Sequence, residues 1–132
     1  MFAVSCFCLL LALAGQADNA SAHDPAHSAD AQLSRAEAAF DRAHDAYESG
    51  KMEAGDTALD DMNKALDACL GSLEEAHKSK HYKKAELRVA NLQRRMASLL
   101  DDIPLPQRGW AEQMSRKLDQ THDKLLEGVM RK

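Results

Sequence analysis

Residues 82–103 read YKKAELRVANLQRRMASLLDDI, and this stretch decides the fold class. Its apolar residues recur at alternating steps of three and four, which places them on one side of an α-helix. The members of this stripe are Tyr82, Ala85, Val89, Leu92, Met96, Leu99 and Ile103. The pattern predicts an amphipathic helix over 80–103 that buries its apolar side against other elements.

The same spacing occurs in three further segments, over 30–49, 52–78 and 106–130. The first stripe consists of Leu33, Ala36, Phe40, Ala43 and Tyr47. The second skips one position at Gly55 and consists of Met52, Leu59, Met62, Leu66, Cys69, Leu73 and Ala76. The last is the least regular and consists of Trp110, Met114, Leu118, Thr121, Leu125 and Val129. Each segment is therefore predicted to be a helix.

The boundaries of these helices have recognisable signals. Asp30 or Ser28 can cap the start of the first, and Gly50 suits its end. Around 77–81 the apolar stripe shifts by two residues, which favours a tight turn with Ser79 as N-cap, although a continuous bent helix would also fit. Pro104 stops the third helix, and Pro106 is expected in the first turn of the fourth.

No segment alternates apolar and polar residues over the length of a strand, so the sequence predicts an all-α fold. Steps of three and four favour coiled-coil-like packing of long helices, and short connections favour antiparallel neighbours. We therefore expect an antiparallel helical bundle, or a pair of helical hairpins, with three to four long helices after a signal peptide.

The signal peptide is predicted from the first residues, MFAVSCFCLLLALAG, which are uncharged and largely apolar. This run is shorter than the roughly 20 residues that span a bilayer. The pattern Ala20-Ser21-Ala22 predicts cleavage after residue 22, with Ala17 as the alternative site. The usual positive residues at the start are missing. We expect a signal peptide over 1–22, a flexible leader over 23–29, one helical domain over 30–132, and a periplasmic or secreted protein.

Cleavage would remove two of the three cysteines, Cys6 and Cys8, and leave Cys69. A single cysteine excludes an intramolecular disulfide. Because Cys69 lies on an apolar stripe, we expect a buried, unreactive thiol rather than a nucleophile.

Charge is strongly segregated along the chain. Residues 23–75 contain thirteen acidic and four basic side chains, a net charge of −9, whereas residues 76–100 contain seven basic and one acidic, a net charge of +6. The candidate interaction patch in this basic segment consists of Lys80, Lys83, Lys84, Arg88, Arg94 and Arg95. Two interpretations compete: these cations face the acidic helices and set the helix order, or they face outward towards an acidic partner or an anionic membrane.

Six histidines raise the question of metal binding. His77 and His81 are four residues apart, a spacing that would place both on one face of a continuous helix, but they flank the predicted turn. His23 would offer copper an amino group and an imidazole after cleavage at residue 22. A haem is disfavoured because the methionines lie on core stripes and no C-x-x-C-H motif is present. We predict no metal site and no cofactor.

The chain also lacks a recognisable catalytic motif. Glu74-Glu75-Ala76-His77 is a single Glu-x-x-His and has no second copy, as a di-iron bundle would require. We therefore expect a non-enzyme: an exported interaction or structural module that binds a protein partner or itself, with at most weak contact to anionic membranes and none to nucleic acid. The alternative is a periplasmic metal- or haem-binding carrier.

Two resemblances accompany this interpretation. Ala46-Tyr47-Glu48-Ser49-Gly50, followed by Ala58, Met62 and Lys64-Ala65-Leu66, resembles one tetratricopeptide-type helical hairpin with a longer loop. A single hairpin does not imply a peptide-binding array, because such arrays need about three repeats. The order of signal, Ala-rich hairpin, basic helix and proline break resembles that of small exported helical proteins of bacteria. This second resemblance implies no activity.

Overall fold

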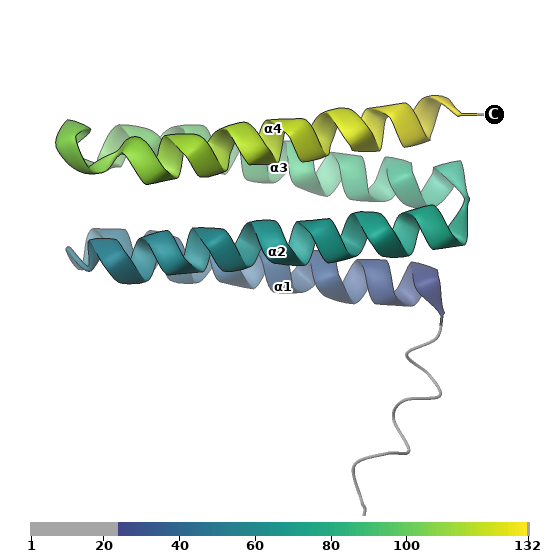
Figure 1. Ribbon diagram of the computed structural model, residues 1–132, viewed down its shortest axis with the longest axis horizontal. Helices are drawn as coiled ribbons and strands as arrows, with labels where there is room; N and C mark the ends of the chain where they lie inside the picture. Colours follow the sequence, from purple (N-terminus) through teal and green to yellow (C-terminus); the bar gives the residue numbers. More distant parts are fainter. Residues whose placement is uncertain (1–23, 132) are drawn as a thin grey trace, which may run out of the picture.

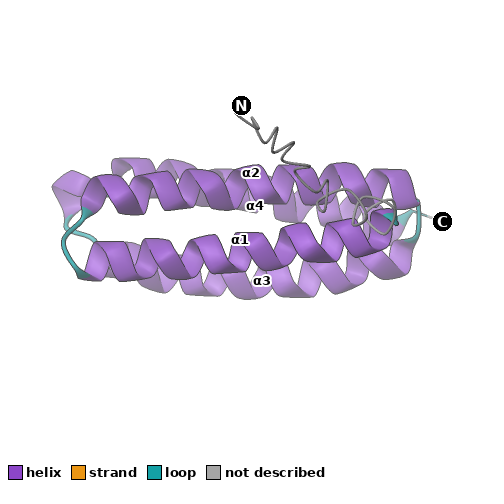
Figure 2. Ribbon diagram, turned by 90° about the horizontal axis from the view of Figure 1, so that it is seen from below, coloured by secondary structure: helices purple, strands orange, loops and turns teal. Residues whose placement is uncertain are grey.

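The computed structural model describes residues 24–131 as four long antiparallel helices (Figures 1 and 2). They are α1 (Pro25–Glu48), α2 (Met52–Ala76), α3 (Ser79–Asp102) and α4 (Gly109–Met130), with a short 3₁₀ helix, η2 (Leu105–Gln107), before α4. No strand occurs in this part of the chain. The predicted all-α bundle is confirmed. The predicted signal peptide over 1–22, and His23, lie outside the described residues.

The helices form two hairpins, α1–α2 and α3–α4, that lie one on the other (Figure 1). Across the two hairpins, α1 packs on α3 and α2 packs on α4. Nearly all residues of the predicted stripes are buried, and they pack together in one core. Its largest side chains include Phe40, Leu59, Met62, Leu92, Met96 and Met114.

The prediction of a flexible leader over 23–29 is wrong for residues 25–29, because α1 begins at Pro25. Asp24 caps this helix: its side chain accepts a hydrogen bond from the backbone N–H of Ala26 at 3.1 Å. Proline fits the first helical position, where no backbone N–H is needed. The expected caps Ser28 and Asp30 therefore lie inside the helix, and Ala29 is part of the core.

The predicted turn between the second and third helices is confirmed. Only His77 and Lys78 separate α2 from α3, and His77 has a left-handed backbone with φ 55°. Ser79 is the first residue of α3 rather than its cap, and Lys78 at the cap position makes no side-chain cap bond. The shift of the apolar stripe explains the turn, since a continuous helix would point the α3 stripe away from the core shared with α2.

The start of α4 is also corrected. Pro106 lies in η2 and not in α4, which begins three residues later at Gly109. The guanidinium of Arg108 donates two hydrogen bonds to the carbonyl of Ile103, at 3.1 and 2.8 Å, and so satisfies the end of α3. Trp110, which the pattern placed in the core, lies in the first turn of α4 and is 40% exposed; its indole N–H donates to the carbonyl of Asp56 at 3.0 Å.

Two tyrosines pack directly on glycines. The Tyr47 ring lies on Gly55, where an added Cβ would come within 2.6 Å of ring atoms, and the Tyr82 ring lies still closer to Gly128. The predicted stripe has no apolar side chain at Gly55, and the structure shows that the Tyr47 ring fills the space beside this glycine. Gly71, by contrast, faces open space.

Glycine-to-alanine substitutions should therefore have opposite effects at two helical positions. Gly128→Ala should lower the free energy of unfolding by about 1–3 kcal/mol, because the added methyl overlaps the Tyr82 ring. The control, Gly71→Ala, should raise it by about 0.5–1 kcal/mol, because alanine is the better helix former. Urea denaturation measures both, and a stabilising Gly128→Ala would contradict this packing.

Candidate functional site

The six basic residues predicted as an interaction patch fall into two rows on α3. We call Lys84, Arg88 and Arg95 the inward row, because all three contact α1. We call Lys80, Lys83 and Arg94 the outward row, because they point away from it. The rows adjoin at Lys80 and Lys84, which are one helical turn apart. The ion pairs of Lys84, Arg88 and Arg95 with α1 nevertheless keep the six residues from forming one outward patch.

Arg88 is the centre of the inward row. Its guanidinium donates to Asp30 Oδ1 at 2.7 Å, to Ser34 Oγ at 3.1 Å and to Glu37 Oε1, all on α1. Burial alone would lower the pKa of Arg88, but the hydrogen bonds and charges of Glu37 and Asp30 together raise it. Charge-assisted bonds of this kind are stronger than neutral ones, so Arg88 fastens the second hairpin to the first.

The other two inward cations reinforce this contact. Arg95 donates to Asp41 Oδ1 at 2.5 Å, and its guanidinium lies 4.5 Å from the centre of the Phe40 ring. That arrangement adds a cation–π interaction to the ion pair. Lys84 lies 3.4 Å from Asp30 Oδ1. For these three residues the structure supports the first interpretation, in which charge sets the helix order.

The outward row is different. Lys80 and Lys83 are exposed and form no ion pair with residues 24–131, and Arg94 bonds to Asn91 of its own helix at 3.3 Å. Leu87 lies between them with 61% of its surface exposed. We define the outer face of α3 as the second stripe with steps of three and four, formed by Lys80, Lys83, Leu87, Ala90, Arg94 and Ala97.

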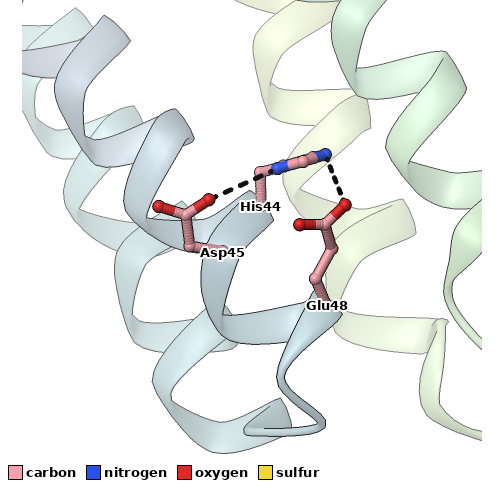
Figure 3. A group of neighbouring side chains, drawn as sticks. All are labelled: His44, Asp45 and Glu48. Carbon is pink, nitrogen blue, oxygen red and sulfur yellow. Dashed lines mark ion pairs between the residues drawn. The ribbon is translucent and has the colours of Figure 1, made fainter.

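A cluster on α1 combines a histidine with two carboxylates (Figure 3). His44 Nδ1 lies 3.6 Å from Asp45 and Nε2 lies 3.5 Å from Glu48, so the two ring nitrogens face different carboxylates. One ligand atom from each residue fits within 4.8 Å, but Asp45 and Glu48 are largely exposed. A divalent ion here would keep much of its coordination sphere in water, and the ion pairs by themselves explain the cluster.

Other titratable groups are part of the packing. His122 pairs with Glu86 at 2.8 Å between α4 and α3, with less than a fifth of each side chain exposed. The Tyr47 hydroxyl donates to Asp56 at 2.5 Å, and burial together with this carboxylate raises the pKa of Tyr47. Cys69 is buried as predicted, and desolvation raises the pKa of its thiol to about 11.

The sequence patterns missed one buried polar residue, Asn63. Its amide N–H group donates to the carbonyl of Met114 at 3.2 Å, while its Oδ1 has no partner in the described chain. Asn63 lies next to the stripe residue Met62 on the side of α2 that meets α4. The helical period places Asn63 at the edge of the apolar stripe of α2, and this position could have predicted its partial or full burial.

None of the helices in the described chain combines the length and apolar character needed to cross a membrane. Comparison with protein-family models, curated proteins and solved structures finds no match to this chain.

The two rows of α3 should respond differently to neutralisation. Changing Lys84, Arg88 and Arg95 together to Gln should lower the free energy of unfolding by about 2–4 kcal/mol, because Arg88 loses partly buried charged hydrogen bonds. Changing Lys80, Lys83 and Arg94 to Gln removes the same charge from the same helix and should alter it by less than about 0.5 kcal/mol.

Thermal or urea denaturation followed by circular dichroism compares the two triple variants. Helix propensity is not a confounding factor, because Gln ranks close to Lys and Arg. Equal destabilisation by both sets would show that the division into rows is wrong.

Proposed function

We propose that this protein is a non-catalytic, exported helical module that binds an acidic helical segment of a partner protein through the outer face of α3. The observation that supports this most is the fate of the basic residues: α1 engages three of them, while the other three surround an exposed leucine. Exposed cations that form no ion pair within residues 24–131 are available to another molecule.

The spacing of the outer face favours a helix as its partner. Residues at steps of three and four form the seam along which two helices pack. Leu87 supplies an apolar centre, and Ala90 and Ala97 are small enough to let a second helix approach. The cations at 80, 83 and 94 would pair with carboxylates flanking the apolar seam of that helix, which gives specificity and faster association.

Other partners fit this face less well. Insertion into a membrane interface requires several large apolar residues on one face, and Leu87 is the single one in this stripe. Single-stranded nucleic acid is bound with the help of stacking aromatic side chains, and the stripe has none. The uncharged, largely apolar run over 1–15 supports export.

The outward triple variant, Lys80, Lys83 and Arg94 to Gln, should lose partner binding while it keeps its fold. Pull-downs from the exported fraction with wild type and this variant should show one protein retained by wild type alone. Its retention should fall steeply with salt, because exposed charges are screened beyond about 8–10 Å at physiological ionic strength. Mass spectrometry of the exported protein itself should show that its first residue is at or near His23.

A matched control is Arg116→Gln with Lys117→Gln and Lys124→Gln, which removes three charges from α4 and should leave binding unchanged. Retention of the partner by the outward variant would contradict the proposal, and so would binding to anionic vesicles with no protein partner. Stoichiometric metal or haem in the purified protein would favour the carrier function instead.

A further inference from the structure

One end of the bundle contains a cavity of about 290 Å³. At this end α1 begins and α2 connects to α3 (Figure 1). The floor of the cavity is buried and apolar, and includes Leu33, Leu73 and the thiol-bearing Cys69. Its rim carries charged and titratable side chains. Three helices thus line a cavity that is open on one side, with polar groups around an apolar floor.

Three potential metal ligands line this one cavity, each from a different helix: His27 on α1, Cys69 on α2 and His81 on α3. In the described chain, the histidine ring nitrogens that form hydrogen bonds or ion pairs belong to His44 and His122. The imidazoles of His27 and His81 are therefore uncommitted there. Thiolate and imidazole are the ligands that zinc and similar ions prefer.

The rim of the cavity also carries acidic side chains. Asp24 and Asp30 line it together with Lys84. Asp30 is paired with Lys84 and Arg88, so Asp24 is the carboxylate on the rim that is left to attract a cation. A second hollow shares Asp24 and His81 with the cavity and adds Glu75 and Lys78 at the end of the bundle. The carboxylates of Asp24 and Glu75 thus lie at the same end of the bundle as the cavity.

We propose that this cavity binds a zinc-class divalent metal ion through Cys69 Sγ and the imidazoles of His27 and His81, with water in the fourth position. The three donor atoms do not lie within 4.8 Å of one another as they stand. The histidines must therefore rotate inward from the rim, which their exposed and half-exposed positions allow. The site is separate from the outer face of α3, so each proposal can fail without the other.

Binding must displace a proton. The ion forms a bond to Cys69 sulfur while the S–H bond breaks, and the proton passes to solvent. The ion and the proton therefore compete for the sulfur, and the apparent affinity should rise with pH.

Titration of the exported protein, purified as it is secreted, with Co²⁺ tests the site, because Co²⁺ is a spectroscopic substitute for zinc. One equivalent should produce a thiolate-to-cobalt charge-transfer band, which zinc then abolishes by displacing the cobalt. His27→Gln and His81→Gln should each weaken binding at least about tenfold, and Cys69→Ala should remove the band. His77→Gln, on the nearby turn, and His44→Gln, in the surface cluster, are the controls and should change neither.

Several outcomes would overturn the proposal. Binding without the charge-transfer band, lost in His44→Gln, would place the ion at the surface cluster of α1. A band that survives in both His27→Gln and His81→Gln would show binding to sulfur alone. Absence of binding in wild type at pH 8 would also contradict it. If Cys69→Ala is unstable, the variants His27→Gln and His81→Gln still test the site. Both histidines lie at the rim, so replacing them should leave the core intact.

Discussion

Arg88 connects the two halves of this molecule. The apolar stripes of both hairpins meet in one core, and the contact of α1 with α3 places a guanidinium against Asp30 and Glu37. An arginine held by two carboxylates has a defined direction. Together with the buried apolar stripe of α3, it fixes the rotation of α3 about its own axis, and this rotation decides what the other residues of α3 face.

The functional surfaces follow from that rotation. With Arg88 turned towards α1, Lys84 and Arg95 are brought to the same carboxylate-lined side, and Leu87 is turned into solvent with Lys80, Lys83 and Arg94 around it. His81 is turned towards the cavity that Cys69 and His27 also line. A single helix thus contributes to the core, to the contact between hairpins and to both proposed binding sites.

Much of the fold could be predicted from the sequence because apolar spacing is a direct consequence of helical geometry. The stripe residues from Leu33 to Leu125 are buried almost as expected, and the two-residue shift at His77 marked the turn. The start of α1 was missed because Pro25 and its polar neighbours resemble a leader, although Asp24-Pro25 is also a strong helix start. Trp110 was misplaced because its indole lies at the surface, where it bonds to the backbone of Asp56 near the start of α2.

The candidate sites were less predictable. Segregated charge identified α3, but which of its cations meet α1 depends on the three-dimensional register of α3 against Asp30, Glu37 and Asp41. Likewise, Cys69 was correctly predicted to be buried, while its cavity depends on how three helix ends meet. No spacing within the sequence links His27, Cys69 and His81, because they lie on separate helices.

A double-mutant cycle between Arg88 and Glu37 tests the central claim most directly. The free energy of unfolding is measured for wild type, Arg88→Gln, Glu37→Gln and the double variant, which isolates the interaction of the two side chains. If this contact joins the hairpins, the coupling energy should be about 1 kcal/mol or more, at or above the upper end of the roughly 0.2–1 kcal/mol measured for exposed pairs. Additive effects of the two substitutions would contradict this account of how the hairpins are held together.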